Sequence, residues 1–166
     1  MSAYKRDSKS QICVLNSADP ITPGGEYLDG QPTQEASLCR HTLLYPTLDG
    51  NEMYKAIKNG GNQIDGTDIM IFSPDVSVFR DAMYKEFIHP FRINVISSCP
   101  VDNRKCELVT GPKLMEKRIR KIIKLAAAKK TEVLILGAFG CGAFKNDPKK
   151  ISDSFYKILV SEGLKY

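Results

Sequence analysis

The sequence predicts one α/β domain with a largely parallel sheet. Short runs of consecutive apolar, β-branched residues are typical of strands that helices cover on both faces. Stretches with helical periodicity separate these runs, and such alternation is typical of parallel sheets. The chain has 166 residues, a usual length for one domain. Because neither a repeat nor a linker divides it, we expect a single domain over 1–166 with its core at about 11–163.

In the first half of the chain, two predicted strands flank two predicted helices. Ile12–Leu15 is the first strand. Thr33–Tyr45 is the first helix, because its threonine can cap the amino end. Asn51–Lys58 is a shorter helix that an Asn-Gly-Gly sequence ends, and Ile69–Phe72 is the second strand.

The second half of the chain repeats this alternation. Ile93–Ile96 and Val133–Leu136 are the third and fourth predicted strands. Lys113–Lys130 lies between them and is the clearest helix, because its apolar residues fall along one side. Pro148–Gly163 is the last helix, with a proline at its start and a glycine at its end.

The composition excludes several classes of protein. Lys and Arg number 24 against 19 Asp and Glu, a net charge of +5, and 42% of the residues are hydrophobic. These values are ordinary for a folded domain and indicate neither disorder nor nucleic-acid binding. Val133–Phe139 is too short an apolar run for a bilayer span, and Met1–Gln11 lacks the apolar core of a signal peptide. We therefore expect a cytoplasmic protein with no membrane partner.

The cysteines and histidines predict neither disulfides nor a metal site. The five cysteines form no CxxC pair, and His41 and His89 lie far apart in the sequence. We therefore expect reduced thiols, no metal and no other cofactor. The basic residues of Lys113–Lys130 are interpreted as a solvated helix face, with nucleic-acid binding as the weaker alternative.

Two glycine-rich segments follow predicted strands, and α/β domains bind ligands beyond the carboxyl ends of their strands. Gly137–Phe144 follows the last strand and contains three glycines. Either its backbone N–H groups cradle a diphosphate, or its glycines only relieve crowding in a tight turn. Asn16–Gly30 follows the first strand, and its polar side chains are either ribose acceptors or ordinary turn formers.

These segments carry motifs in a known order. Gly24-Gly25-Glu26, seven residues before Gln34-Glu35-Ala36, resembles the Gly-Gly-Gly…Gln-Glu-Glu signature of poly(ADP-ribose) glycohydrolases. Ser37–Arg40 continues the helix as the microbial branch of that family does. Phe72–Asp81 resembles the central segment of that branch, and Leu136–Pro148 is similar to its second phosphate loop.

The resemblance covers about Ile12 to Leu159 and implies a macrodomain, a three-layer α/β/α fold with a mixed, largely parallel sheet. It further implies that ADP-ribose, or an ADP-ribosyl conjugate, is the partner and binds at the strand ends. Phe144 would pack on the distal ribose, and Glu35 would support binding. The ligand contacts carried over by motif are Asn16, Asp19, Gly24, Gly25, Glu26, Gln34, Gly140, Cys141, Gly142, Ala143 and Phe144.

The sequence departs from the family pattern around the reacting ribose. Ala36 stands where the family has its catalytic glutamate, and loss of a positioned acid typically lowers the rate by about 10²–10⁴-fold. Glu26 replaces the third glycine, and Asp19 replaces an asparagine. Two carboxylates would thus stand near a diphosphate, so either they point away or the ligand carries a cation there.

Three functions agree with these residues. The first is a module that binds ADP-ribose, an ADP-ribosylated target or a derived nucleotide, with weak or no hydrolysis. The second is an active ADP-ribosyl hydrolase that uses Glu35, Asp19 or Glu26 as its acid or base. The third is a substrate-trapping variant of such an enzyme, with Ala36 as the trapping change.

Overall fold

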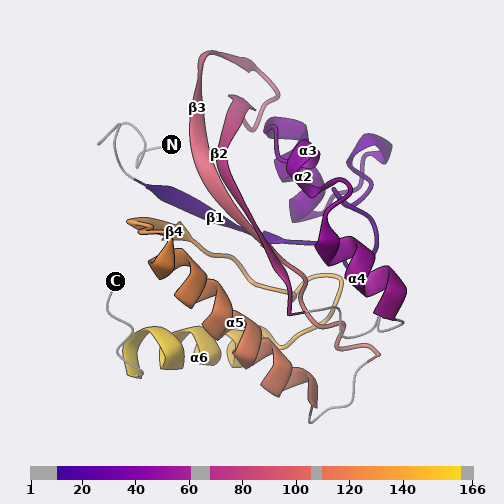
Figure 1. Ribbon diagram of the computed structural model, residues 1–166, viewed down its shortest axis with the longest axis vertical. Coiled ribbons are helices and arrows are strands. Elements are labelled where there is room, and N and C mark those ends of the chain that lie inside the picture. Colours follow the sequence, from indigo (N-terminus) through magenta and orange to yellow (C-terminus); the bar gives the residue numbers. More distant parts are fainter. Residues whose placement is uncertain (1–10, 61–67, 106–109, 162–166) are drawn as a thin grey trace.

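The computed structural model describes residues 11–60, 68–105 and 110–161. Its four described strands form one mixed sheet in the order β2–β3–β1–β4 (Figure 1). β1 runs parallel to both of its neighbours, β3 and β4, whereas β2 and β3 form an antiparallel hairpin. The strands are β1 (Ile12–Ser17), β2 (Met70–Arg80), β3 (Glu86–Ser98) and β4 (Val133–Ile135).

Helices cover both faces of the sheet, as the continuous apolar runs predict (Figure 1). One layer holds α2 to α4 and the other holds α5 and α6. The bounds are η1 (Tyr27–Asp29), α2 (Gln34–His41), α3 (Tyr45–Leu48), α4 (Glu52–Gly60), α5 (Thr110–Ala128), α6 (Pro148–Tyr156) and the following π turn η2 (Lys157–Ser161).

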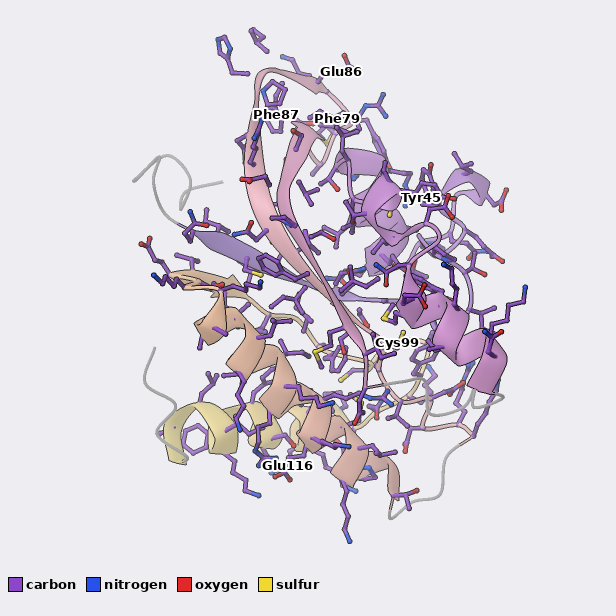
Figure 2. The ribbon with its side chains drawn as sticks, viewed as in Figure 1. Tyr45, Phe79, Glu86, Phe87, Cys99 and Glu116 are labelled. Atoms are coloured by element: carbon purple, nitrogen blue, oxygen red, sulfur yellow. The ribbon has the colours of Figure 1, made fainter. Side chains whose placement is uncertain are left out.

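The central strand divides its side chains between two hydrophobic cores. Ile12 packs in the core beneath α2 and α4, and Cys13 and Leu15 pack in the core beneath α5 and α6. Figure 2 shows Cys99, just beyond β3, in the interior of the molecule. A sheet buried on both faces between two helical layers confirms the predicted α/β class and three-layer architecture.

The prediction missed the length of the hairpin. Only the inner ends of its strands were expected, at Ile69–Phe72 and Ile93–Ile96, whereas β2 and β3 are 11 and 13 residues long. The outer half of the hairpin extends beyond the core, and Ile88 is 91% exposed. Figure 2 shows Phe79 and Phe87 in this outer part. A strand outside the core needs no continuous apolar run, so that signal is absent there.

The helix expected over Thr33–Tyr45 is also shorter than predicted. Thr33 is its N-cap, as expected, and accepts a hydrogen bond from the Ala36 N–H. The helix ends at His41 because the next residue, Thr42, forms a β-bridge with Val78 of β2. Among the other predicted helices, the expected carboxyl end of the last, Gly163, lies outside the described residues.

The topology brings three loops to one edge of the sheet. Because β1, β3 and β4 run parallel, their carboxyl ends meet there. The loops after β1 and β4 are the two glycine-rich segments found in the sequence, and the loop after β3 joins them. No helix in the described part of the chain has the length and apolar character that a bilayer span needs.

Candidate functional site

A cleft of about 630 Å³ opens at this edge, between the loops after β1 and β4. One wall comes from the end of β1, the loop that follows it and the start of α2. The opposite wall is the glycine-rich loop after β4. The residues that line the cleft are Leu15, Ser17, Ala18, Asp19, Pro32, Thr33, Gln34, Glu35, Gly137, Ala138, Phe139, Gly140, Gly142, Ala143 and Phe144.

The glycines of the loop after β4 do two different things. Gly140 has φ +73°, and a Cβ there would lie 2.7 Å from both Pro100 Cβ and Asn146 Nδ2, so this glycine is needed for packing. Gly137 and Gly142 line the cleft, and a Cβ on either would meet open space. These two glycines therefore leave the backbone bare toward the cleft, which suits close approach of an anion.

The glycines of the first loop are packed behind the cleft wall. Gly24 and Gly25 are buried and have φ of +80° and +56°. A Cβ on Gly24 would lie 2.8 Å from the ring of Tyr45, and one on Gly25 would lie 3.1 Å from Thr33 Oγ1. Neither glycine lines the cleft in this structure, so their contact with a diphosphate stays a prediction.

Asp19 and Glu26 are the two carboxylates that depart from the family pattern, and the structure shows what surrounds each of them. Asp19 Oδ1 accepts hydrogen bonds from the N–H groups of Ile21 and Thr22, at 2.8 and 2.7 Å. Glu26 lies in the left-handed backbone region that favours glycine, with φ +55°, and is exposed outside the cleft lining. Glu26 therefore agrees with the alternative in which the charge points away from the ligand, whereas Asp19 lines the cleft with its Oδ1 occupied by backbone N–H groups.

Glu35 is the centre of a buried hydrogen-bond network at the floor of the cleft. Its side chain accepts from Asn16 Nδ2 and Tyr54 OH at 3.1 Å each, and from the Asp19 N–H at 2.7 Å. Glu35 is 1% exposed, and this burial raises its pKa to about 7 although the three donors oppose the shift. The carboxyl group therefore lines the cleft with most of its acceptor sites already occupied.

Three further predicted residues support the cleft walls. Gln34 accepts from the Ser17 N–H and donates to the Leu15 carbonyl, both at 2.7 Å, and so ties α2 to the end of β1. Ala36 is fully buried and does not line the cleft. Cys141 is half-buried outside the lining, and its thiol donates to the Phe139 carbonyl.

The predicted site residues thus fall into two groups. Those that line the cleft are Asp19, Gln34, Glu35, Gly140, Gly142, Ala143 and Phe144. Those that do not line it are Asn16, Gly24, Gly25, Glu26, Ala36 and Cys141. Within the described part of the chain, no group of three or more His, Cys, Asp or Glu side chains is arranged to hold a metal ion.

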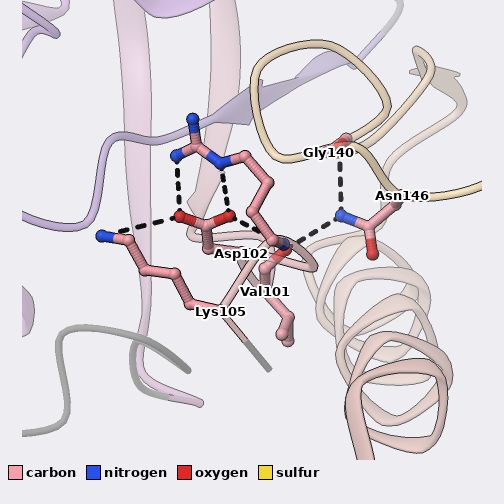
Figure 3. A network of polar contacts seen from close by, with 6 residues as sticks. Val101, Asp102, Lys105, Gly140 and Asn146 are labelled. Atoms are coloured by element: carbon pink, nitrogen blue, oxygen red, sulfur yellow. Dashed lines mark hydrogen bonds and ion pairs between the residues drawn. The ribbon is translucent and has the colours of Figure 1, made fainter. Parts of the chain in front are cut away.

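Sequence reasoning missed the loop after β3. Its Asn103 N–H donates to the Phe144 carbonyl at 3.0 Å, and Asn146 Nδ2 joins the carbonyls of Val101 and Gly140 (Figure 3). Asp102 in the same loop binds Arg104 through two side-chain hydrogen bonds. The position of this segment after a predicted strand was the available signal, because it carries no glycines to mark it.

A macrodomain-like α/β fold with a cleft at its strand ends is the class that this geometry defines. The model of the microbial-type PARG catalytic domain matches residues 1–81. The poly(ADP-ribose) glycohydrolase of Deinococcus radiodurans, solved with ADP-ribose, is 31% identical; the match covers 98% of this chain and 68% of that one, with a TM-score of 0.86. The chain therefore belongs to the microbial-type poly(ADP-ribose) glycohydrolase family.

A second solved relative is similar but longer. The enzyme from Thermomonospora curvata is 30% identical, with a TM-score of 0.87, and the match covers 96% of this chain but 61% of that one. The same enzyme bound to the inhibitor ADP-HPD is also 30% identical, with coverages of 95% and 62% and a TM-score of 0.87. This chain thus spans about three-fifths of the length of that relative. No curated protein matches it.

Proposed function

We propose that this chain binds ADP-ribose, or an ADP-ribosyl conjugate, in the cleft between the loops after β1 and β4, and hydrolyses it weakly or not at all. Family membership and the ADP-ribose bound to the D. radiodurans relative support the ligand. The proposal of weak or absent hydrolysis rests on the residue at position 36. An alanine, fully buried and outside the cleft lining, stands where the resemblance places the catalytic acid.

Backbone groups would bind the diphosphate in this proposal. No lysine or arginine is among the described residues that line the cleft, whose charged lining residues are Asp19 and Glu35. A bare glycine wall exposes N–H groups, and such groups bind phosphates without a cationic cluster. The modest net charge of +5 agrees with this mode of binding.

A specific observation favours hydrolysis as the second candidate. Glu35 lines the cleft, and burial raises its pKa to about 7, so part of the population carries a proton at neutral pH. A protonated carboxyl group could serve as the acid for a leaving oxygen. Asp19 lines the cleft too, but its Oδ1 already accepts two backbone hydrogen bonds.

Replacement of Ala36 tests the proposal directly. We expect calorimetry to show ADP-ribose binding by the natural sequence, and release of ADP-ribose from a modified protein or polymer to be slow. Ala36→Glu supplies the missing acid and should raise release by about 10²-fold or more. Ala36→Gln is the matched control, because it adds the same bulk at this buried position without a proton. Thermal melts of both variants check that they fold.

The alternative makes a different prediction for the same assay. If Glu35 is the working acid, the natural sequence should already release ADP-ribose as fast as Ala36→Glu does, and Glu35→Gln should abolish that release. Such a result would replace the binding module with an enzyme. Absence of ADP-ribose binding by the natural sequence would contradict both functions.

A further inference from the structure

The loop after β3 is fixed against the glycine wall of the cleft by side-chain amides. Asn103 donates from its backbone N–H to the Phe144 carbonyl and from Nδ2 to the Lys145 carbonyl, at 3.0 and 3.2 Å. Asn146 Nδ2 donates to the carbonyls of Val101 and Gly140, at 2.9 and 3.0 Å (Figure 3). Three of these hydrogen bonds therefore hold the two loops together at one rim of the cleft, and the fourth, from Asn146 to Gly140, lies within the loop after β4.

This loop presents two cations around one buried carboxylate. The Asp102 side chain is 6% exposed and accepts from Arg104 Nε and Nη2 at 2.8 and 2.7 Å. Lys105 Nζ lies 3.8 Å from Asp102 Oδ2 (Figure 3). The bidentate geometry fixes the plane of the guanidinium group, and the cluster keeps a net charge of +1.

Arg104 connects this charge to the cleft. Its guanidinium carbon lies 5.8 Å from the ring centroid of Phe144, which lines the cleft. Its side chain is 49% exposed, and its Nη1 has no hydrogen-bond partner among the described residues. An arginine held at one edge and open at the other is suited to bind a phosphate with its remaining donors.

The charge of this rim contrasts with that of the cleft itself. Asp19 and Glu35 are the charged side chains among the described lining residues, and the proposed function assigns the anion-binding donors of the glycine wall to its backbone. We propose that Arg104, positioned by Asp102 beside Phe144, is a second anion subsite that binds a phosphate group of the ligand other than the diphosphate of ADP-ribose. This inference rests on the proposed function, since it places the extra phosphate on an ADP-ribosyl ligand.

Two kinds of ligand carry such a phosphate. An ADP-ribose dimer carries a second diphosphate beyond the glycosidic bond, and ADP-ribose 2′-phosphate carries a monoester on the adenosine ribose. When the unit whose distal ribose carries the glycosidic bond lies in the cleft, the dimer places its additional phosphate at the distal-ribose end, whereas the 2′-phosphate lies at the adenosine end. Whichever ligand depends on Arg104 therefore identifies the end of the ligand that lies at Phe144.

Calorimetric titration of three ligands tests the subsite. We expect the natural sequence to bind either the dimer or the 2′-phosphate more tightly than ADP-ribose. Arg104→Ala should weaken that ligand by about 10-fold and change the affinity for ADP-ribose by less than about 3-fold. Arg92→Ala is the matched control: it removes another exposed arginine, which lies in β3 about 20 Å of strand before the loop begins, and should change none of the three affinities.

A second variant guards against loss of the fold. Arg104→Ala leaves the buried Asp102 carboxylate without its bidentate partner, whereas Asp102→Asn combined with Arg104→Ala removes both charges and should show the same selective loss. Equal losses for all three ligands, or no loss for any, would overturn the subsite while ADP-ribose binding by the natural sequence upholds the proposed function. If the natural sequence binds no ADP-ribose, the proposed function fails, and the subsite fails with it.

Discussion

At the scale of single residues, Gly140 and Gly142 show how neighbouring glycines meet different demands. Gly140→Ala would combine a left-handed backbone with contacts of 2.7 Å to Pro100 and Asn146. We expect a loss of about 3 kcal/mol or more in the free energy of unfolding, measured by urea denaturation. Gly142→Ala should leave that free energy within about 0.5 kcal/mol, because its Cβ meets nothing within 4 Å, but should weaken ADP-ribose binding in calorimetry, because it adds a methyl group to a residue that lines the cleft.

Gly50→Ala separates the two causes of the Gly140 effect. Gly50 also has a positive φ, +68°, but a Cβ there meets nothing within 4 Å. The free energy of unfolding of Gly50→Ala therefore falls only because of the strained backbone conformation. Equal losses for Gly50→Ala and Gly140→Ala would show that the contacts to Pro100 and Asn146 contribute nothing.

Glu35 gives the molecule a stability that depends on pH. Burial raises the pKa of this carboxyl group from its ordinary 4.5 to about 7, so the folded state holds a proton that the unfolded chain releases. The resulting stabilisation is complete below pH 4.5 and is lost as the pH rises through 7. The change is about 3 kcal/mol. Urea denaturation from pH 4.5 to 7.5 should show this slope in the natural sequence.

The same series in Glu35→Gln isolates the group. Glutamine keeps the size of the side chain and its carbonyl acceptor but cannot titrate, so the slope between pH 4.5 and 7 should flatten. Parallel curves for the two proteins would show that Glu35 does not hold its proton in the folded state.

At the scale of elements, helix α5 shows why its basic sequence is not simply a solvated face. Arg118 is 2% exposed, donates to the Cys99 carbonyl at 2.8 Å and forms an ion pair with Asp68. Lys117 and Lys121 of the same helix also pair with Asp68. Part of the charge run therefore anchors the helix to the start of β2, which no periodicity in the sequence could have indicated.

Removal of the Asp68 carboxylate should show how much this anchoring contributes to the free energy of unfolding. Asp68→Asn leaves Arg118 buried beside an uncharged partner, and we expect a loss of about 2–3 kcal/mol in the free energy of unfolding by chemical denaturation. Glu116→Gln is the comparison on the same helix, because Glu116 pairs with Arg120 and Lys157 at the surface. That change should cost less than about 1 kcal/mol, and equal costs would contradict the anchoring.

At the scale of the whole molecule, the sequence predicted the layers and the cleft better than it predicted the walls. Continuous apolar runs predicted the positions of all four described strands, because a buried strand needs apolar residues. The glycine-rich loops predicted the position of the site, because a bare backbone needs glycines. The sequence carries no comparable signal for the packing of Gly24 and Gly25 behind the cleft wall. It carries none either for the loop around Asp102, which contacts Phe144 only through tertiary interactions. Side-chain direction and contacts between loops depend on the assembled sheet.

The position of β1 in the middle of the sheet also bears on the order in which the protein forms. Cys13 pairs opposite Asn94, and Ile12 pairs opposite Val133. The first strand in the sequence, β1, therefore pairs with strands from the middle and the end of the described chain. The β2–β3 hairpin, by contrast, closes between neighbours in sequence. During synthesis the hairpin, whose β3 is one partner of β1, can form while β4, the other partner, is still missing. Since pairing between distant segments slows folding, completion of β1 by β4 should be among the last steps, and the cleft whose two walls follow these strands is assembled with it.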